Sequence, residues 1–183
     1  MKKMMIVAMA LFVAVAAQAS SLSWGTKTGA LLYNSAGTAA IAANNTQFQM
    51  VLVLTGGADV TSWEQSAFET AIKQTASVST MTAGQVTATL TGVLAANNGN
   101  IYQMFGKDTV SGNYFFLKYV TGGAPVASYT VSGITSGTEL IPAYNFSANA
   151  NFGAQVDFVP EPTSMALLAL GVAAVGLRRR FKK

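Results

Sequence analysis

The chain has 183 residues, a formal net charge of +4 at pH 7, and neither cysteine nor histidine. Without cysteine there are no disulfides and no thiolate metal ligands, and without histidine the Ser/His/Asp triad and most zinc sites are excluded. We therefore predict no catalytic residues, no metal site and no cofactor, and we expect that the protein is not an enzyme.

The first nineteen residues have the pattern of a secretory signal peptide. Two lysines form a basic start, residues 4–16 are apolar, and Ala17 and Ala19 form an A-x-A cleavage site before Ser20. We predict that the Sec machinery and signal peptidase act on this segment and that the mature protein begins at Ser20. An uncleaved signal anchor is the alternative.

Most of the positive charge lies at the two ends of the chain. Residues 20–159 hold four lysines against six acidic side chains, so this central part is mildly acidic. Phosphate binding depends on clustered lysine and arginine, which this part lacks, so nucleic acid is not an expected partner. A span of about 140 residues is the size of one domain. We predict a single exported, β-rich domain here.

The early part of this domain contains two predicted strand regions. Short apolar patches at residues 21–24 and 30–33 predict a weak hairpin, and the small polar residues 34–45 predict a loop. Residues 47–50 then alternate between polar and apolar. Residues 51–54 are continuously apolar, which predicts a strand that is covered on both faces.

One amphipathic helix is predicted over residues 62–75. Ser62 and Gln65 have the spacing of a capping box, and Glu69 precedes Lys73 in a favourable i,i+4 pair. Apolar side chains recur at spacings of three and four, which predicts a stripe that packs against a sheet. These side chains are Trp63, Ala67, Phe68, Ala71 and Ile72.

The sequence after this helix is typical of β-strands. Residues 86–91 alternate apolar side chains with threonines, and an Asn-Gly turn within residues 97–100 predicts that residues 101–105 return antiparallel. Further turns predict an antiparallel meander through residues 114–120 and 126–131.

The last predicted strand, residues 149–158, has the cleanest alternation. Its apolar side consists of Ala150, Phe152, Ala154, Val156 and Phe158. Almost no spacer separates this strand from Pro160, so the domain must lie close to the membrane until it is processed. The predicted fold class is mainly β: an antiparallel sandwich or curled sheet with one packed amphipathic helix, plus a cleaved signal peptide and a C-terminal transmembrane helix.

Residues 160–183 form a tail with three parts. Pro160, Glu161 and Pro162 are an extended polar motif, because each proline fixes its own φ and restricts the residue before it. Residues 163–177 are uncharged and mostly apolar, and they predict a short membrane-spanning helix. Five basic residues follow, which are Arg178, Arg179, Arg180, Lys182 and Lys183. If residues 163–177 span the membrane, these basic side chains can reach the lipid–water interface, and they mark the cytoplasmic side. The alternative is a helix buried in the protein core, which would have to end where five basic side chains are exposed to water.

The order of polar motif, apolar segment and arginine-rich end resembles the PEP-CTERM sorting signal of bacterial surface proteins. The resemblance covers about the last twenty-five residues and carries no information on the domain before them. It implies recognition by an exosortase, a membrane enzyme expected to cleave near Pro160, Glu161 and Pro162 and to release or re-attach the protein. The protein would then be membrane-anchored through its C-terminus first, and afterwards be at the cell surface or extracellular.

Acidic residues in the domain offer little catalytic chemistry. Asp59, Glu64 and Glu69 gather at the start of the predicted helix, where they complement the helix dipole. A glycosidase needs two carboxyl groups about 5 to 10 Å apart across a cleft. Only folding could bring such a pair together from the remaining acidic residues, which are Asp108, Glu139 and Asp157.

An aromatic set has two interpretations. It could form a stacking platform for sugar rings, but the favoured interpretation is that phenylalanines fill the core and tyrosines lie at its edge. The set consists of Tyr102, Phe105, Tyr114, Phe115, Phe116, Tyr119 and Tyr129.

Two function classes remain. The preferred one is a surface or extracellular-matrix protein with a structural or adhesive role, and the family resemblance adds that such proteins usually accompany exopolysaccharide production. The alternative is a carbohydrate-binding module, or a hydrolase, that acts on that exopolysaccharide. An exposed row of tyrosines would favour binding, and a carboxylate pair in a cleft would favour catalysis.

Overall fold

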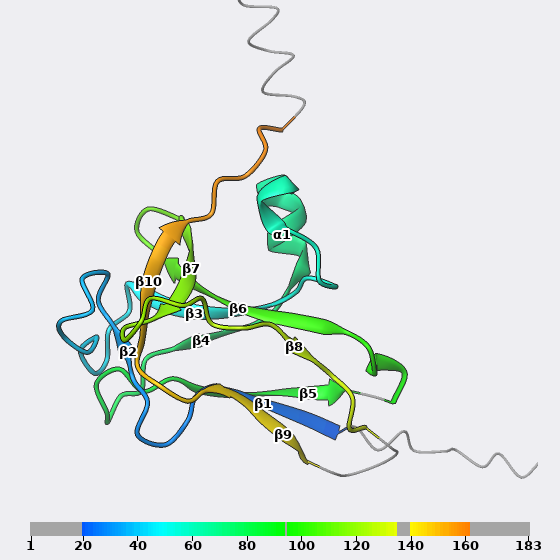
Figure 1. The fold of residues 1–183 in the computed structure, drawn as a ribbon, viewed down its shortest axis with the longest axis horizontal. Helices are drawn as coiled ribbons and strands as arrows, with labels where there is room; N and C mark the ends of the chain where they lie inside the picture. Colours follow the sequence, from blue (N-terminus) through cyan, green and yellow to red (C-terminus); the bar gives the residue numbers. More distant parts are fainter. Residues whose placement is uncertain (1–19, 94, 135–139, 162–183) are drawn as a thin grey trace, which may run out of the picture.

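The computed structural model describes residues 20–93, 95–134 and 140–161. They form a mainly β domain with a single α-helix, as the sequence predicts (Figure 1). The predicted signal peptide, the predicted transmembrane helix at residues 163–177 and the basic tail lie outside the described residues. Within the described part, no helix is long and apolar enough to cross a bilayer.

A three-stranded sheet has the first strand of the domain at its centre. β1 (Ser20–Thr26) pairs antiparallel with β5 (Thr87–Val93) and parallel with β9 (Leu140–Phe146). The predicted hairpin of residues 21–24 with 30–33 is therefore wrong. The physical reason is that β1 pairs with β5 along its length, and at its end the Thr26 amide nitrogen donates to the carbonyl oxygen of Val86, the residue before β5, at 2.6 Å.

The larger sheet holds the remaining strands in the order β2-β10-β7-β6-β3-β4, with β8 paired to β6. Their bounds are β2 (Leu32–Tyr33), β3 (Phe48–Leu54), β4 (Ile72–Ser77), β6 (Ile101–Asp108), β7 (Tyr114–Tyr119), β8 (Tyr129–Thr130) and β10 (Ala150–Gln155). Most neighbours are antiparallel, but β2 and β10 are parallel. The strand predicted to be covered on both faces at residues 51–54 is confirmed for residues 51–53, which are buried, whereas Leu54 is half-buried.

Two further predicted strand pairings differ from the structure, one of them only in part. The hairpin of residues 86–91 with 101–105 is wrong, because β5 and β6 belong to different sheets. The antiparallel pairing of β6 with β7 across the turn near Ser111 is confirmed. In the meander, the predicted strand 126–131 returns beside β7 only at its start, where the Val126 amide nitrogen donates to the Leu117 carbonyl oxygen at 2.9 Å. Its later residues form β8, which pairs with β6.

The predicted helix is correct in place but too long. α1 covers only Gln65–Ala71, and the chain then continues directly into β4, which pairs with β3. Lys73 therefore lies on a strand and makes no helical i,i+4 pair with Glu69. The capping box is absent too, since the Ser62 hydroxyl donates to the Asp59 carbonyl oxygen within a short 3₁₀ turn.

Two apolar cores cover the two faces of the larger sheet. Met50 and Leu52 of β3 point into the first core, which they share with Leu22 and Trp24 of the smaller sheet. The alternate β3 residues, Val51 and Val53, point into the second core under α1. The period-two alternation of a strand thus allows one continuously apolar segment to serve both layers.

Candidate functional site

The chain remains attached to the domain after its last strand. β10 ends at Gln155, earlier than the predicted end at residue 158, and its pairing with β7 is irregular after Phe152. Residues 156–159, which we call the C-terminal strap, then cross to the end of the molecule that carries α1 (Figure 1). The predicted apolar side of the strand is broken at Ala154, which is exposed.

Backbone hydrogen bonds hold the strap at both of its ends. The Val156 amide nitrogen donates to the Tyr114 carbonyl oxygen at 2.8 Å. The Val159 amide nitrogen donates to the Trp63 carbonyl oxygen, also at 2.8 Å, and Val159 forms a parallel bridge with Glu64. The strap is thus attached to β7 and to the segment just before α1.

Phe158 fixes the middle of the strap by aromatic packing. Its ring centroid lies 5.0 Å from that of Phe68 and 6.1 Å from that of Tyr114. Phe68 is the fully buried residue of α1, and its ring also contacts Phe105 at 5.0 Å. The second core therefore joins the helix, the sheet and the strap in one aromatic cluster.

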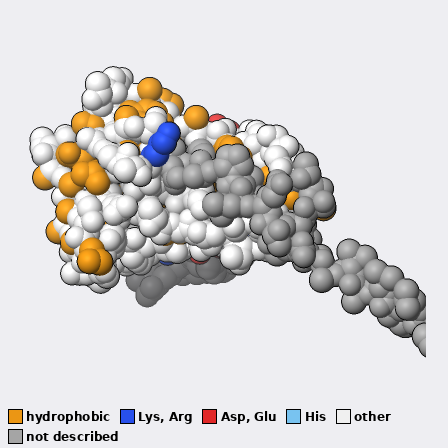
Figure 2. All heavy atoms as spheres, turned by 90° about the horizontal axis from the view of Figure 1, so that it is seen from below, with side chains coloured by type: hydrophobic (Ala, Val, Ile, Leu, Met, Phe, Trp, Pro, Cys, Tyr) orange, Lys and Arg blue, Asp and Glu red, His pale blue; other side chains and the backbone are white. Residues whose placement is uncertain are grey.

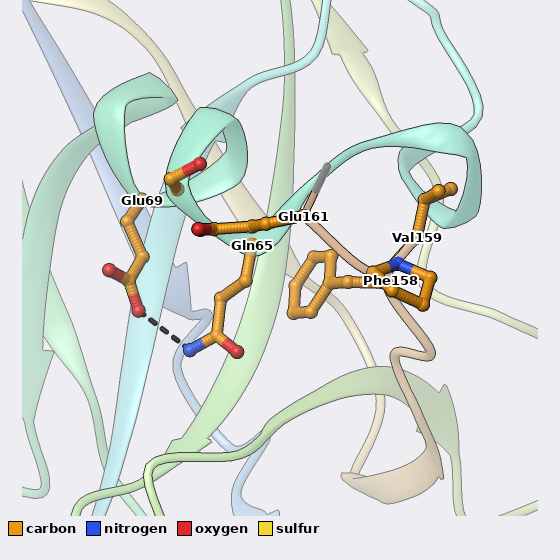
Figure 3. Close-up of a pocket in the computed structure, with 7 residues that line it drawn as sticks. Gln65, Glu69, Phe158, Val159 and Glu161 are labelled. Carbon is orange, nitrogen blue, oxygen red and sulfur yellow. Dashed lines mark hydrogen bonds between the residues drawn. The ribbon is translucent and has the colours of Figure 1, made fainter. Parts of the chain in front are cut away.

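An open pocket of about 370 Å³ lies where the strap leaves the domain (Figure 3). One side is formed by the exposed helix residues Gln65, Ser66 and Glu69, and the other by residues 158–161. The Gln65 side chain donates to a carboxylate oxygen of Glu69 at 2.9 Å.

The structure describes part of the predicted sorting residues. Pro160 and Glu161 are exposed beside α1. Pro162 and the basic residues Arg178, Arg179, Arg180, Lys182 and Lys183 lie outside the described part, as do Ala17 and Ala19. Ser20, the predicted first residue of the mature protein, is buried and begins β1.

Comparison with known families matches this junction and the residues after it. The family model of the PEP-CTERM protein-sorting motif matches residues 158–180. The chain carries a PEP-CTERM sorting signal. No curated protein and no solved structure gave a significant match to the chain. The PEP-CTERM signal implies export, C-terminal membrane anchoring before processing, and processing by an exosortase-type enzyme.

The matched PEP-CTERM region begins inside the folded domain. Its first residue, Phe158, belongs to the aromatic cluster, and its second, Val159, is hydrogen bonded to Trp63. Sequence reasoning found the polar motif, but it missed the side chains of Gln65 and Ser66 beside it. No pattern in the sequence around Gln65 and Ser66 could have indicated this position, because they face residues 158–161, which are about ninety residues later in the chain.

Tyr114 connects the pocket to the second core. Its hydroxyl donates to the Glu69 carboxylate at 3.3 Å, and the Lys107 ammonium lies 5.2 Å from the centre of its ring. Burial raises the pKa of the Tyr114 phenol above its ordinary value. The phenol is protonated at neutral pH, as tyrosine ordinarily is, and donates to Glu69.

Two of the acidic residues considered for catalysis, Asp59 and Asp108, have structural roles as hydrogen-bond acceptors in turns. The Asp59 carboxylate accepts hydrogen bonds from the backbone and hydroxyl of Thr61, which lower its pKa. The Asp108 carboxylate accepts from the Val110 amide nitrogen at 2.9 Å, which lowers its pKa in the β6–β7 turn. Glu139 lies outside the described residues. Among those described, no group of three or more acidic side chains could hold a metal ion.

The aromatic set is divided between the two cores. Phe105 and Tyr114 are buried in the second core, and Tyr102 is buried in the first. Phe115, Tyr119 and Tyr129 are half-buried against the first core, and Phe116 against the second. The favoured interpretation of phenylalanines in the core is thus confirmed for Phe105, whereas Tyr102 and Tyr114 lie deeper than predicted.

Proposed function

We propose that the β domain is a structural or adhesive component of the bacterial cell surface or extracellular matrix, delivered by the exosortase-type route. The proposal includes no catalytic activity. It is supported most by one observation, an in-register array of hydroxyl groups on the outward side of the three-stranded sheet.

This array arises from the alternation of β5 and β1. Thr87, Thr89 and Thr91 are exposed, and their neighbours Ala88 and Leu90 pack against the first core. Residues directly opposite in an antiparallel pair lie on the same face, so the half-buried Ser21 opposite Thr91 and Ser23 opposite Thr89 extend the array. The partner of Thr87 is Gly25, which adds no hydroxyl.

Charged side chains are few on the described surface of this side of the molecule, and hydrophobic side chains lie on it in separate patches (Figure 2). Figure 2 views the domain from below Figure 1, the side on which β1, β5 and β9 lie, and much of the described surface is neither charged nor hydrophobic. Hydroxyl groups both donate and accept hydrogen bonds, so such a surface complements the hydroxyl groups of an exopolysaccharide. Each contact is weak, and adhesion would result from many of them.

Replacement of the three β5 threonines by valine tests this proposal. Valine keeps the β-branched shape and removes the hydroxyl. At about 0.5 kcal/mol for each lost hydrogen bond, the triple variant should bind the host's extracted exopolysaccharide about tenfold more weakly in cosedimentation.

A matched control changes three exposed threonines outside β5, namely Thr75, Thr121 and Thr130, to valine. This control should bind like the wild type. Equal binding by the β5 variant and the wild type, or equal loss in both variants, would overturn the proposal.

A further inference from the structure

We propose that the enzyme that processes the PEP-CTERM signal docks on the exposed side of α1 as well as on the motif, and that it presents a basic side chain to the pocket between Glu69 and Glu161. The inference rests on the sorting role of the signal. It adds a recognition surface, made of Gln65, Ser66 and Glu69, that lies about ninety residues before the motif.

The motif residue Glu161 lies within a short length of chain from the attached strap. Val159 is hydrogen bonded to Trp63, and Glu161 follows only two residues later. Two extended residues span about 7 Å at most, so Glu161 stays beside α1 while the strap is attached. An enzyme that binds Glu161 on the folded domain therefore contacts the helix.

The strap is stably attached to the domain. Detaching it would break the hydrogen bonds of Val156 and Val159 and would expose the ring of Phe158, which is packed on Phe68. Binding to the attached strap avoids these losses. The folded junction, and not a free peptide, is thus the form of the substrate that the enzyme meets most often.

The lining of the pocket carries acidic side chains and no basic ones. Glu69 and Glu161 are exposed on the same pocket, and no lysine or arginine is among the residues that line it. Complementary potentials favour encounter and orientation at an interface, so a lysine or arginine of the enzyme fits here. Glu69 would then assist recognition of the motif without being part of it.

Two pairs of variants test the proposal in the full chain, expressed in its native host. Glu69→Gln removes a charge at the pocket and keeps the oxygen that accepts from Tyr114, whereas Glu64→Gln makes the same change on the other side of α1. Ser66→Lys adds a positive charge to the pocket, and Ala67→Lys adds it one residue later on that other side.

Pulse–chase labelling with mass spectrometry would measure the rate at which the C-terminus is removed. From the size of exposed charge interactions, Glu69→Gln and Ser66→Lys should be processed about 2- to 5-fold more slowly, while Glu64→Gln and Ala67→Lys keep the wild-type rate. Equal rates for all four variants and the wild type would overturn the docking proposal, as would equal slowing within each pair.

Glu161→Ala separates this proposal from the sorting role itself. If Glu161→Ala blocks processing while Glu69→Gln and Ser66→Lys do not slow it, the enzyme reads the motif alone and only the docking proposal fails. If Glu161→Ala leaves the mature C-terminus and its rate of formation unchanged, the sorting role fails as well. The melting temperature of each accumulated protein shows whether a slow rate comes from misfolding, and Ser66→Lys leaves the Glu69 contacts intact for that comparison.

Discussion

The amide nitrogen of Val159 donates a 2.8 Å hydrogen bond to the carbonyl oxygen of Trp63. This bond joins the second residue of the PEP-CTERM match to the segment that leads into α1. A sorting signal is often pictured as a tail that follows a domain, but here its first residues are part of the folded structure. The position of the motif Pro160–Glu161 is consequently set by the packing of the second core.

Removal of the Phe158 ring should weaken the whole domain. Phe158 is half-buried and contacts Phe68 and Tyr114, so Phe158→Ala should lower the free energy of unfolding by about 1–2 kcal/mol. Denaturant unfolding of the secreted protein measures this. Val110→Ala is the control, because Val110 is exposed and the change should stay within about 0.5 kcal/mol. Equal stabilities of the two variants would mean that the strap is not packed on the domain.

Gln74 connects the two sheets through its side-chain amide. It accepts from the indole nitrogen of Trp24 at 2.6 Å and donates to the Thr89 carbonyl oxygen at 3.0 Å. Trp24 is fully buried, so Gln74→Leu leaves the indole N–H of Trp24 without a hydrogen-bond acceptor. This variant should lower the free energy of unfolding by about 1–3 kcal/mol.

The control for this prediction is Gln49→Leu. Gln49 is also half-buried, but its side chain makes only a long 3.4 Å contact with Ser77, and its loss should cost less than about 0.5 kcal/mol. A similar loss in both variants would show that the link between the sheets contributes little to stability.

Gly106 is required by the ring of Phe152. A Cβ at position 106 would lie inside that ring, so Gly106→Ala should destabilise the domain by about 1–3 kcal/mol. Phe152→Leu removes the ring with which the new methyl group clashes. It should therefore lower the free energy of unfolding less in the Gly106→Ala background than in the wild type. A double-mutant cycle by denaturant unfolding measures the coupling, and additive costs would rule out the close approach.

Asp108 should make stability depend on pH below its ordinary pKa. The Val110 amide nitrogen holds the pKa of this carboxyl below the usual 3.8, so its contribution is present above pH 3.8 and is lost as the pH falls through the lower, folded-state value. Asp108→Asn should be less stable than the wild type at neutral pH, and the difference should shrink in acid. Thermal melting across pH measures it, and a constant difference at every pH would contradict the assignment.

Local patterns predicted the strands well, whereas their partners depended on distant contacts. The apolar run of β3 and the threonine alternation of β5 were visible in sequence and are present in the structure. The Asn-Gly turn within residues 97–100 is present, since the Asn100 amide nitrogen donates to the Asn97 carbonyl oxygen at 2.9 Å. It follows the 3₁₀ turn at Ala95–Asn97 and connects strands of different sheets, so the hairpin that it suggested is wrong and the pairing of β5 with β1 was missed. β9 was not predicted; it contains Pro142, which an edge strand tolerates.

The end of the helix and the attachment of the sorting motif also depend on contacts between residues far apart in the sequence. The three-and-four spacing that predicted a helix continues into Ile72, but sheet pairing of β4 with β3 ends the helix at Ala71. The polar motif could be found from sequence, since its signal lies in consecutive residues. Its attachment through Phe158 and Val159 could not, because their partners Phe68 and Trp63 lie about ninety residues earlier.

Mass spectrometry of the mature C-terminus, purified from the native host, tests the sorting assignment most directly. We predict a mature protein that has lost Arg178–Lys183 and still contains the strap, and a Glu161→Ala variant that keeps the full tail. An intact C-terminus in the wild type, unchanged by Glu161→Ala, would contradict it.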